Sequence, residues 1–224
     1  FRMARELGVI ASLHQGGGPA RTPDGWQVLE REGLLGPHVN IVHGHALDDA
    51  QLARFCGLGM SFSAAAESEM SQGHGHPLTG RLRALGRAPS LGTDLESVLS
   101  GDMLTQARVA LGMQRTLDNA AHRAAHGSIP PTSTIPAIEA LQWVTVEGAR
   151  MLGQLDRIGT LAAGKQADLF LRDREMRPHA GIELRIEDAG ERPRDAARRI
   201  KHAVVLDLPD ELPQDPAQWS LWRC

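Results

Sequence analysis

The sequence has 224 residues, of which 42% are hydrophobic and 23% charged, and its formal net charge is -3. That length and apolar fraction suffice for one large domain or two small ones. The near-neutral charge argues against a nucleic-acid-binding surface, and no uncharged apolar run is long enough to span a membrane. The two cysteines, Cys56 and Cys224, and the lack of a signal-like segment lead us to expect a cytoplasmic protein without a disulfide framework.

The first part of the chain alternates short apolar runs with amphipathic segments. Asp48 is a good N-cap for one of these helices. Strand and helix alternate with a spacing of about 30 residues, which favours a parallel sheet built from βα units. The predicted strands are 9–13, 39–42, 60–63 and 89–94, and the predicted helices are 2–7, 26–32, 50–56 and 78–85.

The second part begins with two longer predicted helices, 102–113 and 135–152, separated by a polar loop around 126–131. Ser133 or Thr134 is the expected N-cap of the second of these helices. Residues 158–171 have the pattern of a small β-hairpin. Beyond residue 171 the periodicity is lost, and only 203–206 has the pattern of a strand before several prolines interrupt the chain.

Polar side chains follow three of the predicted strands, and they are His14, His43 and Asp94. Imidazole nitrogens and carboxylate oxygens bind zinc, iron or manganese while leaving a position open for water. A neighbouring carboxylate can then accept the water proton and deliver it to a leaving group. A scattered set of two histidines and one aspartate more often consists of unrelated surface or loop residues, so both interpretations stay open at this point.

Other polar residues have a weaker functional pattern. Glu67 and Glu69 follow the third strand and could bind an amine or guanidine group of a substrate, or be solvated loop acids. His74 and His76 have the spacing of metal ligands, but they are also compatible with a mobile glycine-rich surface loop. The sequence contains no serine nucleophile elbow, phosphate-binding loop or CxxC motif.

Four motifs occur in a fixed order along the chain: HGHALDD at 43–49, GTD at 92–94, EALQWVTVEGARMLG at 139–153 and IGTLAAGKQADL at 158–169. With them, and with His14 in the expected place, the sequence resembles the amidohydrolase superfamily, in the branch of cytosine/guanine-type deaminases and triazine hydrolases. The resemblance implies an α/β fold, namely the C-terminal half of a (β/α)8 barrel (strands five to eight with their helices) and the start of a small β-sandwich. The implied parts are barrel residues 1–157, a hairpin 158–171 that enters the sandwich, and a divergent tail 172–224.

The resemblance also implies a divalent metal, zinc first and iron as the alternative. In such a site His14 would be a metal ligand, Asp94 a ligand and proton shuttle, and His43 would orient the substrate or the attacking water. The segment from Glu67 to Gly75 resembles a subgroup with unassigned substrates, and we predict that Glu67, Glu69 and His74 bind the substrate.

Two departures from the family pattern matter. The family's HxH pair, which supplies two metal ligands, has no counterpart before His14, so we expect this chain to be a fragment. Deaminases of this branch also carry a glutamate three residues after the strand-five histidine, where this chain has Gly17. This substitution argues against ordinary purine or pyrimidine deamination.

The expected function is therefore a metal-dependent hydrolase fragment that acts on a C–N or related bond of a small molecule, cyclic molecules included. One alternative is a catalytically incomplete half-barrel with a structural role, and another is an unrelated doubly wound domain. A half-barrel has two open strand edges, so we expect self-association through these edges. We expect neither a nucleic-acid nor a membrane partner.

Overall fold

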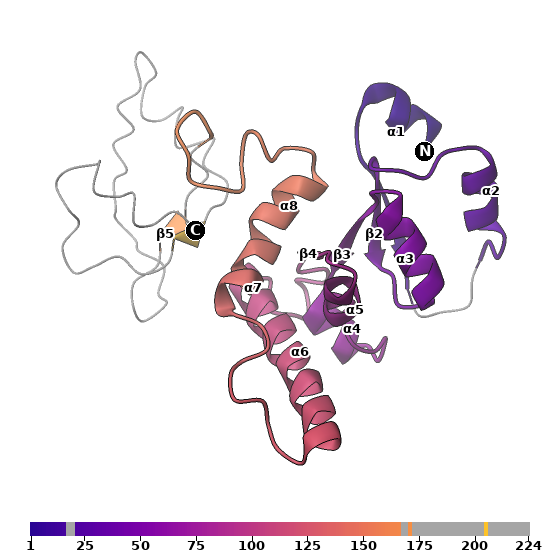
Figure 1. Ribbon diagram of the computed structural model, residues 1–224. Coiled ribbons are helices and arrows are strands. Elements are labelled where there is room, and N and C mark those ends of the chain that lie inside the picture. Colours follow the sequence, from indigo (N-terminus) through magenta and orange to yellow (C-terminus); the bar gives the residue numbers. More distant parts are fainter. Residues whose placement is uncertain (17–20, 167–169, 172–203, 206–224) are drawn as a thin grey trace. The chain divides into compact units, whose positions relative to one another are not determined.

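The computed structural model describes residues 1–16, 21–166, 170–171 and 204–205. The chain divides into two compact units, Phe1–Gly153 and Gln154–Cys224 (Figure 1). The first unit contains a four-stranded sheet with its helices. Among the described residues, no helix combines the length and the apolar character needed to cross a membrane.

The sheet of the first unit has the order β1-β2-β3-β4, and every neighbouring pair is parallel. This arrangement confirms the predicted parallel α/β sheet. The fourth strand ends at Leu91, earlier than the predicted range 89–94, and the left-handed backbone at Asp94 (φ 59°) excludes that residue from an extended strand. The strands are β1 (Ala11–Gln15), β2 (Val39–His43), β3 (Ser61–Ala64) and β4 (Ser90–Leu91).

The helices between these strands are short. Asp48 caps α3 as predicted: its carboxylate accepts from the Gln51 N–H at 2.7 Å, and the Gln51 side chain accepts from the Asp48 N–H. The helix α4 forms where the sequence predicted only loop residues after the third strand. These helices are α1 (Arg2–Leu7), α2 (Gly25–Arg31), α3 (Asp49–Gly57), α4 (Ala66–Ser71) and α5 (Thr79–Ala84).

The later helices differ from the predictions in their ends. The helix α6 (Met103–His126) is not interrupted at Met113, and it ends only where Gly127 adopts a left-handed conformation (φ 71°). The predicted helix 135–152 is divided at Thr145 into α7 (Ala137–Val144) and α8 (Val146–Met151). The predicted cap was also wrong, because Pro136 occupies the N-cap position and the Thr134 hydroxyl donates instead to Asp118 at 2.5 Å.

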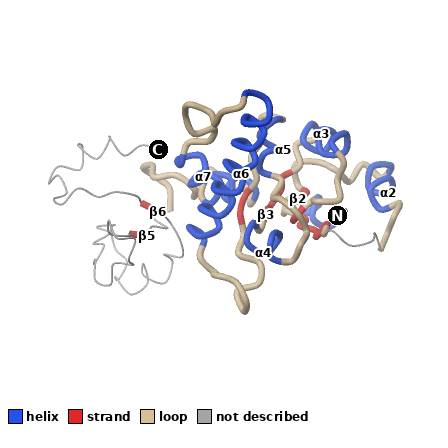
Figure 2. Tube along the Cα trace, turned by 90° about the horizontal axis from the view of Figure 1, so that it is seen from below, coloured by secondary structure: helices blue, strands red, loops and turns tan. Residues whose placement is uncertain are grey.

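The two faces of the sheet have different chemistry. One face packs against α3 and α5, which lie beside the strands in Figure 2. The buried core between them includes Ile41 and Phe62 of the sheet and Leu82 of α5. Serine and asparagine side chains form a hydrogen-bonded row across the strands. They are Ser12, Asn40, Ser61, Ser63 and Ser90. A second buried cluster, which includes Trp143, joins α6 and α7 to β4.

The second unit is described only in part. Residues 158–166 form turns, and β5 (Phe170–Leu171) pairs in parallel with β6 (Val204–Val205), which lies within the predicted strand 203–206. The predicted hairpin 158–171 includes residues 167–169, which lie outside the described residues, as does most of the tail 172–224. The predicted domain boundaries at 157 and 171 therefore stay predictions.

Candidate active site

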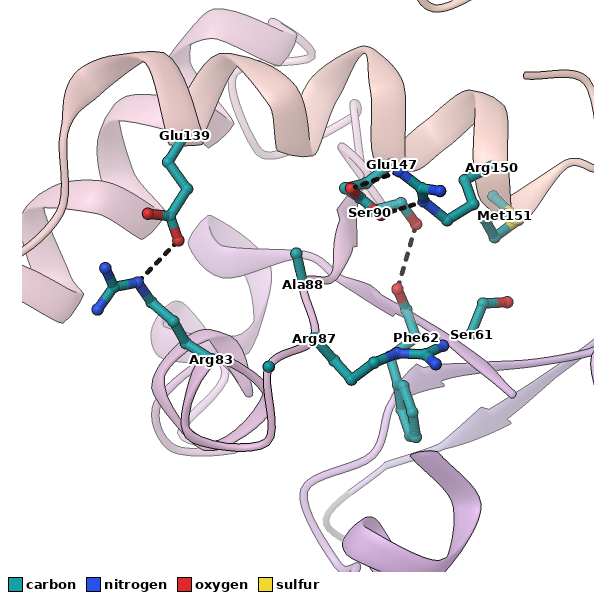
Figure 3. Close-up of a pocket in the computed structure, with 11 residues that line it drawn as sticks. Ser61, Phe62, Arg83, Arg87, Ala88, Ser90, Glu139, Glu147, Arg150 and Met151 are labelled. Carbon is teal, nitrogen blue, oxygen red and sulfur yellow. Dashed lines mark hydrogen bonds and ion pairs between the residues drawn. The ribbon is translucent and has the colours of Figure 1, made fainter. Parts of the chain in front are cut away.

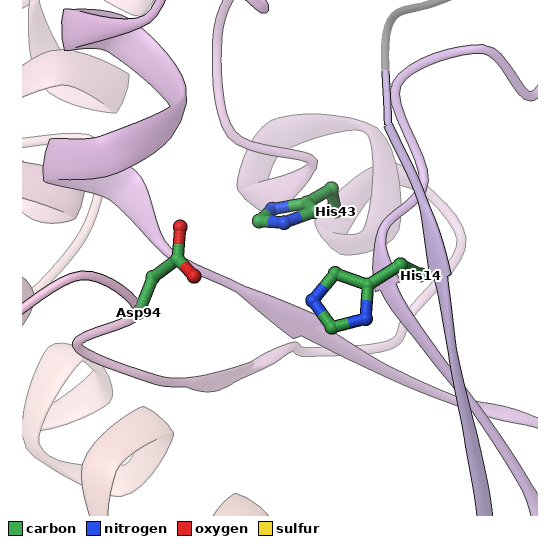
Figure 4. Close-up of side chains that lie close together, drawn as sticks. All are labelled: His14, His43 and Asp94. Carbon is green, nitrogen blue, oxygen red and sulfur yellow. The ribbon is translucent and has the colours of Figure 1, made fainter.

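Three polar side chains meet at the carboxyl edge of the sheet (Figure 4). His14 lies in β1, His43 is the last residue of β2, and Asp94 follows β4. One potential ligand atom from each residue lies within 4.8 Å of the others. The parallel sheet explains this convergence, because the carboxyl ends of its strands share one edge.

Two of these residues have an unusual backbone. His43 (φ 68°) and Asp94 (φ 59°) are the only non-glycine residues with positive φ in the part of the chain that the structure describes. Such conformations cost about 1–3 kcal/mol each and accumulate at functional sites. Histidine and aspartate are among the residues that tolerate them best. The surrounding fold therefore holds both side chains against a local backbone preference, which indicates a functional constraint.

The donor set fits a divalent metal. Two imidazoles and one carboxylate, close together, are ligands typical of zinc and of iron. His14 and Asp94 are exposed and His43 is buried, so the cluster lies at the boundary between solvent and core. The Ser68 hydroxyl donates a hydrogen bond to one oxygen of Asp94 and leaves the other oxygen available.

The buried carboxylate of Glu69 contacts one member of this cluster, His43. Glu69 is completely buried, and its Oε1 accepts from the Ala65 N–H at 2.8 Å and lies 3.0 Å from the Nδ1 of His43. Its Oε2 lies 3.6 Å from the Nε2 of His45. The alternative of a solvated loop acid is therefore wrong for Glu69. Its predicted contact with substrate stays a prediction.

The two histidines beside Glu69 have opposite electrostatic environments. The hydrogen bond from Glu69 raises the pKa of His43, although burial opposes this effect. Burial lowers the pKa of His45, and the charge of Glu69 only partly compensates. His43 is thus the ring that shares its proton with the carboxylate.

The other predicted acid, Glu67, faces different partners. Its Oε2 accepts from the Ser100 hydroxyl at 2.6 Å and from the Gln106 Nε2 at 2.8 Å. The hydrogen bonds from Ser100 contribute most to lowering the pKa of Glu67. This carboxylate connects α4 to α6, and its predicted role in binding substrate stays a prediction.

His74 lies near the buried histidines, whereas His76 is exposed. The His74 ring centroid is 5.9 Å from that of His43 and 6.0 Å from that of His45. His74 is half-buried, and its buried Nδ1 has no hydrogen-bond partner among the described residues. Gly17, where the family resemblance expects a glutamate, lies outside the described residues.

The sequence missed two residues of this cluster, Ser68 and the buried side chain of His45. Ser68 is 1% exposed although serine usually lies at the surface. The ESE sequence at 67–69 could have indicated a helix with one buried face, but only the fold shows which side chains turn inward.

A hollow lined by the residues in Figure 3 lies at the opposite edge of the sheet. It has a volume of about 720 Å³ and lies at the amino ends of β3 and β4, where Ser61 and Ser90 contribute to its lining. Four of its charged lining residues form two ion pairs, Arg83 with Glu139 at 2.8 Å and Arg150 with Glu147 at 3.0 Å, and Arg87 donates to backbone carbonyls. None of His14, His43 and Asp94 lines it.

Comparison with known proteins gives a consistent picture. The family model described as "Amidohydrolase family" matches residues 5–201. A 5-methylthioadenosine/S-adenosylhomocysteine deaminase from Syntrophobacter fumaroxidans is 35% identical over 156 residues, which cover 67% of this chain and 32% of that protein. The chain thus spans about a third of the length of this curated relative.

Two solved structures show the same fold. A zinc-bound adenosine deaminase from Xanthomonas campestris aligns with a TM-score of 0.57 and 26% identity, over 75% of this chain and 38% of that one. The guanine deaminase of E. coli aligns with a TM-score of 0.58 and 21% identity, over 74% of this chain and 38% of that one. With the parallel sheet, these neighbours indicate an α/β, TIM-barrel-like fold.

Proposed function

Because this chain belongs to the amidohydrolase family, we propose that it forms part of a metal-dependent hydrolase that cleaves a C–N or related bond of a small molecule. The observation that carries the proposal is the convergence of His14, His43 and Asp94 from separate strand ends to within 4.8 Å. Membership of the family confirms the resemblance found in the motifs. It also excludes the alternative of an unrelated doubly wound domain.

We further propose that β1 to β4 correspond to strands five to eight of the family's barrel. The order of the sheet and the positions of His14, the HGHALDD motif and the GTD motif support this assignment. A complete metal site would then include the family's HxH pair in addition to the residues described. The chain's short coverage of its relatives is compatible with this assignment.

In this site His14 and Asp94 would hold the metal. A bound divalent metal supplies Lewis acidity that lowers the pKa of water to about 7. The Asp94 carboxylate accepts a proton from the attacking water and delivers it to the leaving group. His43, whose ring lies beside both residues, orients the substrate or the water, and the Ser68 hydroxyl fixes the carboxylate of Asp94.

The relatives suggest which substrates to test first. Their names include 5-methylthioadenosine/S-adenosylhomocysteine deaminase and 5'-deoxyadenosine deaminase, and all belong to enzymes that act on amino-substituted heterocycles. Gly17 replaces the glutamate expected as proton donor, so we propose that the substrate is a small cyclic molecule outside the ordinary purine and pyrimidine set.

Metal analysis and a turnover screen test the proposal together. We expect the purified chain, reconstituted separately with zinc and with iron, to retain a divalent metal after desalting, and Asp94→Asn to retain much less. A panel of heterocyclic amines, with the substrates of the named relatives included, is then assayed for ammonia release. A chain that binds no metal and releases no ammonia would contradict the hydrolase proposal for this sequence.

A second candidate is a catalytically incomplete half-barrel that self-associates. It is favoured by the sheet, because β1 and β4 each pair with one neighbour among the described strands. The outer side of each of these two strands is therefore open for pairing along its length. Light scattering over a range of concentrations would show a dimer or larger species. A monodisperse monomer would contradict this candidate. The cytoplasmic location stays a prediction.

A further inference from the structure

We propose that α4 positions the active site, with Glu69 fixing the ring of His43 and Ser68 fixing the carboxylate of Asp94. These two residues are adjacent in the sequence, and each contacts a different member of the metal-ligand cluster. The inference rests on the proposed function for the chemistry that it serves. It assigns Ser68 and Glu69 as positioning residues and not as groups that touch the substrate.

The contacts of Glu69 determine which tautomer His43 adopts. Oε1 of Glu69 already accepts from the Ala65 N–H, so this oxygen is held as an acceptor. The Nδ1 of His43, 3.0 Å away, must therefore carry the proton that it shares with Oε1. The lone pair of the ring is then on Nε2, the nitrogen that remains for a metal or a substrate. A carboxylate that orients a ligating histidine in this way also increases its basicity.

The contacts of Ser68 give Asp94 a comparable constraint. The Ser68 hydroxyl accepts from the Nε2 of Gln72 at 2.7 Å and donates to Asp94. Because Gln72 supplies the donor to this oxygen, the hydroxyl proton is directed at the aspartate. Asp94 lies in a loop with a left-handed backbone, and this hydrogen bond holds its carboxylate in one orientation.

The helix can serve as a rigid support because its other side is anchored. Glu67 accepts from Ser100 and Gln106, and the Glu67 N–H donates to the Oε1 of Gln106 at 3.2 Å. Gln106 is completely buried in α6, the longest helix that the structure describes. Three consecutive residues of α4 thus face three directions: Glu67 toward α6, Ser68 toward Asp94, and Glu69 toward His43.

The tautomer of His43 tests the role of Glu69 without any need for metal or turnover. In the metal-free, ¹⁵N-labelled chain at alkaline pH, long-range ¹H–¹⁵N spectra distinguish the two neutral tautomers, and His43→Gln assigns the signal. We expect the Nδ1–H form in the wild type. Glu69→Met, which removes the acceptor, should give a mixture or the Nε2–H form. Glu69→Gln should keep the Nδ1–H form, because the Ala65 N–H holds the amide oxygen in place.

Several outcomes would overturn the inference for Glu69. Finding His43 of the wild type in the Nε2–H form would overturn the inference without any variant. The test therefore stays valid even if Glu69→Met fails to fold. A folded Glu69→Met chain with the wild-type tautomer would overturn the inference as well. Identical spectra for Glu69→Met and Glu69→Gln would show that the accepting oxygen does not select the tautomer.

Zinc affinity, measured by calorimetry, tests whether this positioning serves the proposed site. Removing a partner of a metal ligand typically weakens affinity by about 10- to 100-fold. We expect losses of that size for Ser68→Ala and Glu69→Met, and wild-type affinity for Ser71→Ala, an exposed serine of the same helix. Glu139→Gln is the control for the loss of a carboxylate charge, because Glu139 pairs with Arg83 at the amino ends of the strands. Wild-type affinity in Ser68→Ala and Glu69→Met would overturn the inference.

A chain that binds neither zinc nor iron and releases no ammonia would contradict the proposed function and still leave the positioning contacts measurable. The His43 tautomer then decides the role of Glu69. The ¹³C resonance of the Asp94 carboxyl decides the role of Ser68: we expect it to move in Ser68→Ala and to stay fixed in Ser71→Ala. An unchanged resonance in Ser68→Ala would refute the contact.

Discussion

The two ends of the strands in the four-stranded sheet both carry polar residues but use them differently. At the amino edge, Arg83 and Arg150 pair with glutamates around the hollow of about 720 Å³. At the carboxyl edge, His14, His43 and Asp94 converge without forming ion pairs with one another. This hollow is therefore not where His14, His43 and Asp94 gather.

Backbone strain separates the same two edges. Both non-glycine residues with positive φ in the described chain lie at the carboxyl edge, and both belong to the converging cluster. The buried Nδ1 of His74 also lacks a hydrogen-bond partner there among the described residues. The ion pairs around the hollow at the amino edge indicate a role in stability, and the strained backbone of His43 and Asp94 at the carboxyl edge indicates a role in chemistry.

The largest effect is expected from a change in the cluster itself. Asp94→Asn keeps the size of the side chain and a residue type that tolerates positive φ, but it removes the charge that would bind a metal. We expect zinc affinity to fall at least about 100-fold, beyond the usual effect of a supporting residue. Isothermal titration calorimetry measures this loss. Unchanged affinity would contradict the assignment of the carboxyl edge.

At the amino edge the matching change should affect stability alone. The guanidinium of Arg87 donates to the Met60 carbonyl at 3.0 Å and to the Cys56 carbonyl at 3.4 Å. Arg87→Ala leaves both carbonyls without this donor, so we expect the free energy of unfolding to fall by about 1–3 kcal/mol. Urea denaturation measures the change, and zinc affinity should stay at the wild-type value. A fall in zinc affinity would remove the distinction between the edges.

The pH dependence of the two histidines beside Glu69 should differ in sign. His43 has a raised pKa, so its pair with Glu69 stabilises the fold fully below about pH 6.5 and loses this effect as the pH rises through the raised pKa. His45 has a lowered pKa, so its burial destabilises the fold as the pH falls below about 6.5. NMR titration of the metal-free chain should place His43 above His45. The reverse order would refute the network.

The smallest effect is expected for an exposed ion pair. The side chain of Arg83 is 40% exposed and that of Glu139 is 24% exposed, so solvent screens their interaction. Glu139→Gln should lower the free energy of unfolding by less than about 1 kcal/mol. The same denaturation experiment measures it. A loss larger than that of Arg87→Ala would show that this pair is more than a surface contact.

The sequence predicted the first three strands and the parallel sheet because short apolar runs and their spacing are local patterns. Short apolar runs indicate β1 to β3, and Asp48 indicates the N-terminus of α3 as its N-cap. The helix α6 continues to His126 instead of ending at the predicted Met113, and the glycine at 127 is the sequence signal for its observed end. The break at Thr145 lies within the β-branched residues 144–146, and the Thr145 hydroxyl donates to the Leu141 carbonyl at 2.7 Å.

The contacts that position the side chains of the candidate site could not be predicted from local patterns. Nothing in the local pattern of α4 distinguishes Glu67 from Glu69, yet one is held by Ser100 and Gln106 and the other is completely buried beside His43. Burial of a carboxylate depends on partners that are distant in sequence. His43 lies 26 residues before Glu69, so the pairing follows from the parallel sheet and not from spacing.

A crystal of the zinc-loaded chain, with anomalous data collected at the zinc edge, tests the central claim most directly. The account predicts an anomalous peak at the carboxyl edge, about 2.0–2.2 Å from a nitrogen of His14 and an oxygen of Asp94. A peak only at the amino edge, or only at surface histidines such as His122 and His126, would contradict it.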